Sequence, residues 1–177
     1  PPRVHPRPRR WAGVVRRAMA ASGAGPSAED WGQAQLGAII RGAAGAGVIA
    51  FTQFEATARG LFRRLRGQPG IVLLSARGGE TAVGPIPRDE LVALAHPDRL
   101  LRPDPRLPLR LLLSTDLLSE GVNLGRMHHI VHIDLPWTPA RAHQRLGRLR
   151  RPESPHHRLD ASRFALPVAA GRLLGVW

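Results

Sequence analysis

The chain has 177 residues, 43% of them hydrophobic, which is enough for one globular domain with a packed core. It contains no cysteine, which excludes disulfides, thiolate metal sites and cysteine nucleophiles. The formal net charge of +13 favours a polyanionic partner such as DNA or RNA, although GC-rich codon usage would explain the same arginine-rich, lysine-free composition.

The chain opens with a segment, residues 1–26, that is rich in proline and arginine and that we expect to be a flexible lead-in. A short helix over residues 11–21 is compatible with its pattern. We predict no signal peptide and no membrane partner, because no apolar run has the required length. The expectation is a cytoplasmic protein associated with nucleic acid. A helix should then run from about Ser27, a candidate N-cap, to Arg41.

Short apolar runs follow, and each has the continuous apolar character of a strand that is buried on both faces of a sheet. The predicted strands are residues 48–51, 71–74, 109–113 and 130–133, with a last extended segment near 158–166.

Helical stretches alternate with these strands, which is typical of a parallel sheet covered on both faces. The predicted helices are residues 54–66, 88–95 and 138–150, and the predicted loops are residues 78–87 and 97–108. The pattern predicts one α/β domain over residues 27–166 and a tail at 167–177. In such sheets, functional loops lie at the carboxyl ends of the strands.

The helix predicted at 138–150 carries a basic constellation. Gln144, Arg148 and Arg151 have the spacing i, i+4, i+7 and would share one face. Two guanidinium groups on one face repel each other unless an anion lies opposite, and their planar, permanently charged forks suit phosphate oxygens. Gly147 costs the helix about 1 kcal/mol relative to alanine, which suggests that something packs closely there. A solvated basic helix face would show the same spacing.

The strand predicted at 109–113 continues into Ser114, Thr115 and Asp116. Hydroxyl groups and backbone amides at the carboxyl end of a strand are suited to binding phosphates. A serine or threonine that caps the next helix would explain the same residues.

Together, four segments in this order resemble motifs of superfamily 2 helicases, in particular of the Swi/Snf-related branch. Val48–Phe54 resembles motif IV. Ser114–Leu124, with the pattern S-T-D-x-x-S-E-G-x-N-L, resembles motif V, and Gln144–Arg151, with the pattern Q-R-x-G-R-x-x-R, resembles motif VI. Asp134–Pro139, between them, is also similar to that branch. The resemblance covers about residues 47–155.

This resemblance implies the second lobe of an ATP-dependent DNA or RNA translocase, a RecA-like three-layer α/β domain with a central, mostly parallel sheet. In that family ATP lies between two lobes, and its Mg²⁺ is held mainly by the first. The implied arginine fingers, which stabilise charge on the γ-phosphoryl oxygens, are Arg148 and Arg151. The implied ATP-binding residues are Gln144, Glu120, Gly121 and Asn123. The residues implied to face the nucleic acid are Phe51, Thr52, Gln53, Ser114 and Thr115.

The partners that the resemblance implies are DNA, with RNA as an alternative, and a first RecA-like lobe. This chain has no lysine and therefore no P-loop lysine to hold ATP phosphates. Asp89 and Glu90 do not follow an apolar strand, so we do not assign them as magnesium ligands. We expect the first lobe to come from the same polypeptide outside these residues or from a partner chain, and the lobe alone to be inactive as an ATPase.

The sequence also bears on functions other than a translocase. A non-catalytic basic module that binds nucleic acid, or a decayed half-motor, stays open. A Rossmann-type cofactor enzyme is disfavoured, because the glycine-rich segment 42–47 precedes a strand instead of following one. His128, His132 and Asp134 would share one face of a strand, as zinc ligands can, but they lie inside the motif-like interval, and we predict no metal site.

Overall fold

The computed structural model describes six stretches of the chain. They are residues 28–43, 47–96, 108–116, 124–134, 138–150 and 158–164. The predicted lead-in, the predicted tail and nearly all of the loop predicted at 97–108 lie outside them. No helix within these stretches combines the length and the apolar character needed to cross a membrane.

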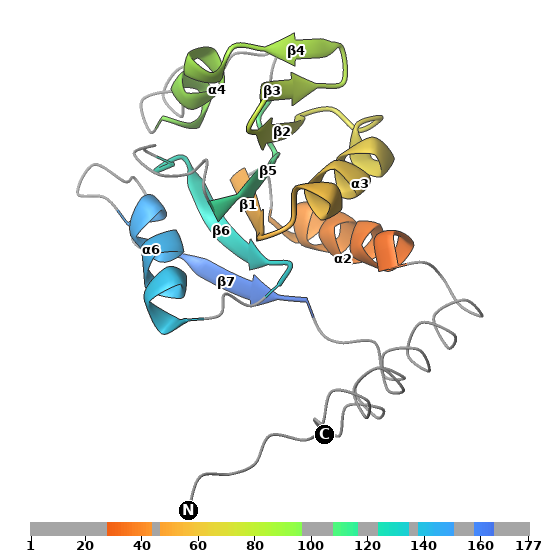
Figure 1. The fold of residues 1–177 in the computed structure, drawn as a ribbon. Coiled ribbons are helices and arrows are strands. Elements are labelled where there is room, and N and C mark those ends of the chain that lie inside the picture. Colours follow the sequence, from red (N-terminus) through yellow and green to blue (C-terminus); the bar gives the residue numbers. More distant parts are fainter. Residues whose placement is uncertain are drawn as a thin grey trace, which may run out of the picture.

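A seven-stranded sheet forms the middle layer, in the order β4-β3-β2-β5-β1-β6-β7, with helices on both faces (Figure 1). Five neighbouring strands are parallel to one another. They are β2 (Ile71–Ser75), β5 (Leu111–Thr115), β1 (Gly47–Thr52), β6 (Met127–His132) and β7 (Asp160–Arg163). The predicted α/β class with a central, mostly parallel sheet is confirmed.

The segment 78–87, predicted as a loop, is instead an antiparallel hairpin on the edge of the sheet. Its strands are β3 (Gly78–Thr81) and β4 (Gly84–Ile86), and β3 pairs with β2. The strands are short and contain glycines, so they lack the apolar pattern that marks a strand. Pro85 is tolerated because β4 is the outermost strand and one of its edges has no neighbour in the sheet. Pairing with the neighbouring strand β2 defines β3 as a strand, although the local sequence does not predict one.

Alternate residues of the central strands pack into two apolar layers. Val48 and Ala50 of β1 face the layer under α2 (Ala28–Gly42) and α3 (Glu55–Leu65). Ile49 and Phe51 face the opposite layer, under α4 (Arg88–Ala95) and α6 (Pro139–Leu149). Because both faces are covered, β1, β2 and β5 are buried along their whole length.

The parallel strands bring their carboxyl ends to one edge of the sheet. Thr52 at the end of β1 is in register with Thr115 at the end of β5, and Phe51 is in register with His132 at the end of β6. Three segments that lie far apart in the sequence therefore meet at this edge. Asp116 and Asp134 follow two of these strand ends, and the candidate site is built here.

Candidate functional site

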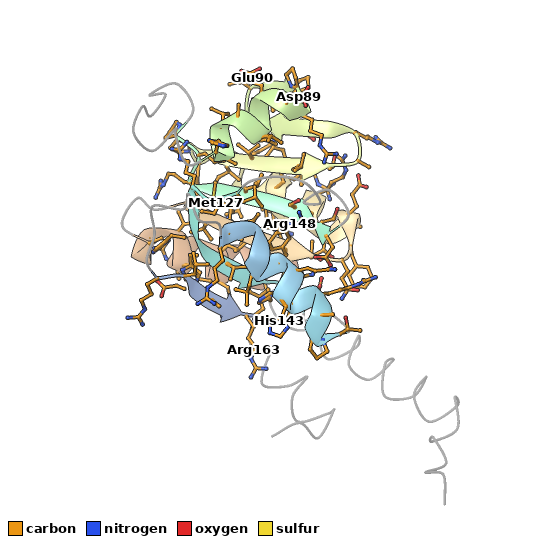
Figure 2. The ribbon with its side chains drawn as sticks, turned by 90° about the vertical axis from the view of Figure 1, so that its left-hand side faces the viewer. Asp89, Glu90, Met127, His143, Arg148 and Arg163 are labelled. Carbon is orange, nitrogen blue, oxygen red and sulfur yellow. The ribbon has the colours of Figure 1, made fainter. Side chains whose placement is uncertain are left out.

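Helix α6 lies over the face of the sheet beside these strand ends (Figure 2). It begins with Pro139 at its first position, where a missing N–H costs nothing, and the Thr138 side chain accepts a hydrogen bond from the backbone N–H of Arg141. Its buried residues are Arg145 and Leu149. A basic side chain thus occupies the side of the helix that packs on the sheet, where an apolar residue is usual.

The helix predicted at 138–150 matches α6 to within one residue at each end. Arg150 has φ −79° and ψ 91°, which is extended backbone, so α6 stops at Leu149. Arg151 lies outside the described stretches, so the prediction that it shares a face with Gln144 and Arg148 stays a prediction.

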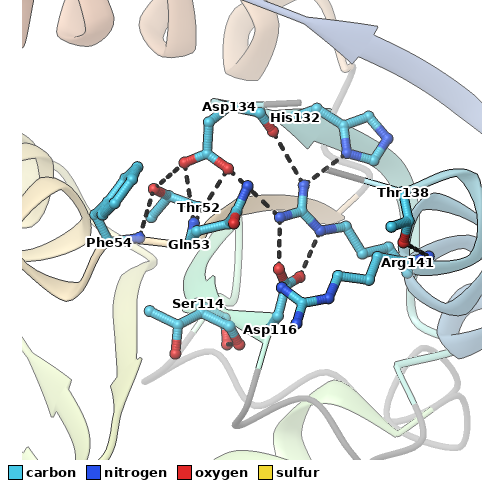
Figure 3. Close-up of polar contacts among 11 residues, drawn as sticks. Thr52, Gln53, Phe54, Ser114, Asp116, His132, Asp134, Thr138 and Arg141 are labelled. Carbon is cyan, nitrogen blue, oxygen red and sulfur yellow. Dashed lines mark hydrogen bonds and ion pairs between the residues drawn. The ribbon is translucent and has the colours of Figure 1, made fainter. Parts of the chain in front are cut away.

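The side chain of Arg145 is 2% exposed, and its guanidinium donors reach three partners (Figure 3). Its Nε and Nη2 donate to the two carboxylate oxygens of Asp116 at 2.5 and 2.8 Å. Its Nη1 donates to His132 Nδ1 at 2.9 Å and to the backbone carbonyl of Asp134 at 3.2 Å. The group also lies over the Phe51 ring, 5.3 Å from its centroid. One side chain of α6 thus contacts the ends of β1, β5 and β6.

Asp134 connects this group to the residues that follow β1. Its carboxylate accepts a hydrogen bond from the Thr52 hydroxyl (Figure 3). The backbone N–H of Gln53 also donates to this carboxylate, and the Gln53 nitrogen lies 2.9 Å from Oδ2 and 3.1 Å from Oδ1. The carboxylate also lies 3.6 Å from Nη2 of Arg145. Two donors at the carboxyl end of β1 are therefore occupied by an anion from the protein itself.

Most of the residues predicted to face nucleic acid have buried side chains. Phe51, Thr52 and Ser114 have no exposed surface, and Thr115 is 8% exposed. Phe51 belongs to the core under α6. The strands stay covered on both faces up to their last residue, so side chains at their ends point into the layers. Gln53, which follows β1, is half-buried and is the most accessible of the five.

The predicted nucleotide-facing residues are described only in part, since Glu120, Gly121, Asn123 and Arg151 lie outside the described stretches.

Two of the predicted nucleotide-facing residues lie on α6. Gln144 is exposed and Arg148 is half-buried. Arg148 has no ion pair with any acidic side chain in the described part of the chain. Figure 2 shows Arg148 and His143 on different sides of α6. The carbonyl of Arg148 accepts a hydrogen bond from the backbone N–H of Leu124 at 3.2 Å, which ties the end of α6 to the end of the motif V-like segment.

Gly147 is exposed, and a Cβ atom built on it would meet nothing within 4 Å among the described residues. The prediction that a neighbour packs closely on this glycine is therefore wrong for the described lobe. Any close neighbour must belong to another part of the chain or to a partner.

The histidines of β6 bind separate partners. His129 Nε2 lies 2.8 Å from the Ser162 hydroxyl, and His128 Nε2 lies 3.5 Å from the carboxylate of Asp160. Burial, and next the nearby guanidinium of Arg145, lower the pKa of His132, so its ring is neutral at pH 7 and Nδ1 accepts the arginine hydrogen bond. The described stretches contain no group of three side chains suited to a metal ion.

Comparisons with known proteins agree with the motifs. Residues 100–153 match the helicase conserved C-terminal domain. A stretch of 43 residues, 24% of this chain, is 42% identical to the uncharacterized ATP-dependent helicase YqhH of Bacillus subtilis (strain 168). This chain carries a helicase carboxyl-terminal domain. The aligned stretch spans only 8% of YqhH, so the likeness identifies the domain and not the activity of a whole protein.

The fold of this helicase domain is shared by solved structures. The C-terminal part of the Fun30 ATPase domain has a TM-score of 0.58 at 14% identity, covering 83% of this chain and 46% of its own. The DEAD-box protein SrmB of E. coli has a TM-score of 0.54 at 18% identity, covering 83% and 76%. The Hef helicase domain of Pyrococcus furiosus has a TM-score of 0.50 at 14% identity, covering 95% and 32%. These likenesses confirm the predicted RecA-like three-layer fold.

The motif assignment gave no role to Arg145 or Asp134, the two residues that organise the site of this helicase domain. The sequence did contain a signal for the first. Ala142, Arg145 and Leu149 have the spacing i, i+3, i+7, so the arginine lies on the apolar stripe of an amphipathic helix. An arginine on the apolar stripe of a helix requires buried hydrogen-bond acceptors, and only the fold shows which groups these are.

Proposed function

We propose that this helicase domain is the second lobe of an ATP-dependent nucleic-acid translocase, of the Swi/Snf-related branch that its motifs resemble. Arg148 and Arg151 act as arginine fingers in this proposal. Gln144, Glu120, Gly121 and Asn123 line the nucleotide side of a cleft between this lobe and the first. DNA is the preferred track, and the charge of +13 supports binding to a polyanion.

The observation that carries the proposal is the state of Arg148. Arg148 is half-buried, and no acidic side chain of the described stretches neutralises it. Arg145, one turn earlier on the same helix, is paired with a carboxylate. Because a guanidinium without an acidic partner in the described part of its lobe is suited to phosphate oxygens, Arg148 fits a triphosphate presented by a neighbouring lobe.

ATP bound between the lobes supplies the γ-phosphoryl group that is transferred to water, with Mg²⁺ held by the first lobe. This chain contributes the guanidinium groups that stabilise the charge on that group. It contributes no lysine to the phosphates. The 177 residues alone are therefore expected to show no ATPase activity.

The nucleic-acid side is proposed at the carboxyl edge of the sheet. Gln53 provides the most accessible side chain there, whereas Thr115 is buried and 8% exposed. Phe51, Thr52 and Ser114 are buried beneath this edge and shape it instead of exposing side chains to a strand.

The test is the replacement Arg148→Ala in the polypeptide that joins this lobe to a lobe with a P-loop. DNA-stimulated ATP turnover should fall by about 10³-fold or more, because arginine fingers contribute on the order of 10³ to 10⁵ in rate. Arg63→Ala is the control, since Arg63 is exposed on α3, over the opposite face of the sheet. Unchanged turnover of the Arg148 variant would contradict the proposal, and parallel assays with RNA decide which nucleic acid stimulates.

A further inference from the structure

We propose that Arg145 and Asp134 form a positioning pair, which links the nucleic-acid edge of the lobe to the proposed finger Arg148. This inference rests on the proposed function and assigns a role to two residues that the motif comparison leaves without one. Neither residue touches a reacting atom in the proposal. Both act through the placement of α6 relative to the strand ends.

The first link joins α6 to the sheet. The planar fork of Arg145 is shared between Asp116 after β5, His132 at the end of β6 and the backbone carbonyl of Asp134. A fork with several fixed acceptors defines both the position and the rotation of the helix that carries it. Arg148 follows by three residues, within one turn of the same helix, so the pairing of Arg145 determines where Arg148 lies.

The second link joins this group to the residues after β1. The carboxylate of Asp134 holds the Thr52 hydroxyl and the Gln53 backbone N–H, while the same side chain lies 3.6 Å from Arg145 Nη2. Thr52 in turn accepts a hydrogen bond from the backbone N–H of Phe54 at 3.2 Å, at the start of α3. A shift of Gln53 on contact with a nucleic-acid strand would therefore displace the Asp134 carboxylate, which lies next to Arg145.

The burial of these charges favours a geometric role over a merely stabilising one. Arg145 is 2% exposed, and the side chains of Asp116 and Asp134 are 22% and 23% exposed. Apolar residues that pack well often stabilise a core as much as a buried ion pair does, because the pair costs desolvation. What the ion pair adds is a fixed orientation of its partners. Here that orientation relates three strand ends to the helix bearing Arg148.

The experiment is a double-mutant cycle on the two-lobe polypeptide, with kcat and the KM for ATP measured at saturating DNA. The variants are Asp134→Asn, Arg148→Ala and the double variant. Asparagine keeps the size of Asp134 and its acceptor for Thr52 and Gln53, but removes the charge next to Arg145. Arg145→Lys is a second probe, which keeps the buried charge and removes the fork. Asp160→Asn is the control, because Asp160 lies on β7 and its carboxylate pairs with His128 instead.

Asp134→Asn and Arg145→Lys should each lower kcat by roughly tenfold or more with little change in the KM for ATP, since small misplacements of catalytic groups cost up to about 10²-fold. In the Arg148→Ala background, Asp134→Asn should cause no further loss, because the group that the pair positions is already absent. The Asp160→Asn control should keep the parent kcat.

A full, additive loss from Asp134→Asn in the Arg148→Ala background would overturn the inference, because the pair would then act independently of the finger. An unchanged kcat for both Asp134→Asn and Arg145→Lys would overturn it as well. If Arg145→Lys fails to fold, the Asp134→Asn cycle decides alone. An unchanged kcat for Arg148→Ala by itself is a different result, which defeats the proposed function.

Discussion

Removal of the Arg145 guanidinium should destabilise the lobe far more than removal of a neighbouring arginine. The replacement Arg145→Met keeps an unbranched side chain of similar reach, but leaves both carboxylate oxygens of Asp116 without their charged donors. Breaking a buried ion pair on one side costs about 3–5 kcal/mol. Because the Asp116 side chain is 22% exposed and water can reach it, the low end of about 3 kcal/mol applies.

A loss of this size is a large part of the about 5–15 kcal/mol that stabilises a typical domain. At about 2–4 °C per kcal/mol for a chain of this length, it corresponds to a fall in Tm of roughly 6–12 °C. Urea denaturation of the 177-residue chain, followed by circular dichroism, measures the free energy of unfolding directly. Adding Asp116→Asn to Arg145→Met should restore part of the loss, because a buried amide costs less than a carboxylate that has lost its guanidinium partner.

The matched control is Arg148→Met on the same helix. Arg148 is half-buried and has no acidic partner among the described residues, so its replacement should change the free energy of unfolding by no more than about 0.5 kcal/mol. Equal losses for Arg145→Met and Arg148→Met would refute the reasoning, as would a loss below about 1 kcal/mol for Arg145→Met.

Two further predictions concern pH and glycine. Burial lowers the pKa of both His129 and His132. Below about pH 6.5 the unfolded chain therefore binds more protons than the folded lobe does. The free energy of unfolding should decrease as pH falls through that value. Urea titrations at pH 7.5 and 5.5 should show this decrease, and replacing both histidines with glutamine should reduce it; an undiminished decrease would exclude them as its source. Gly70→Ala should destabilise strongly, because Gly70 has φ 80° and its Cβ would lie 1.8 Å from the Pro108 carbonyl oxygen. Gly147→Ala should stabilise by up to about 1 kcal/mol, because no described residue lies within 4 Å of the added Cβ. Thermal denaturation of the two alanine variants checks both signs, and a destabilising Gly147→Ala would mean that α6 is more crowded than the structure shows.

The regular elements could be predicted wherever burial imposes one pattern on the local sequence. Fully covered parallel strands require continuous apolar runs, and residues 48–51 and 71–74 fall within β1 and β2. The amphipathic stretch 54–66 matches α3 to within one residue at each end. The hairpin of β3 and β4 escaped prediction because its pairing with β2, and not its own composition, defines it as a pair of strands.

The candidate site, too, could be predicted only in part from the sequence. The order and spacing of the motifs identified the segments that meet at the carboxyl edge, because a parallel sheet fixes where its strands end. They did not show which side chains stay accessible. Phe51 and Ser114 carry the residue types of a contact surface but lie in the covered layers.

The sequence by itself determined the class of domain and the segments that meet at the carboxyl edge of the sheet, since apolar periodicity and motif spacing are local properties of a chain. Only the tertiary structure decided the pairing of charges at that edge. Arg145 has its counter-ion Asp116 at a distance of 29 residues, and Asp134 binds Thr52 across 82. Whether a buried charge is satisfied depends on groups brought together by the sheet. Only once those groups are in place does Arg145 have an acidic partner, while Arg148 has none among the described residues.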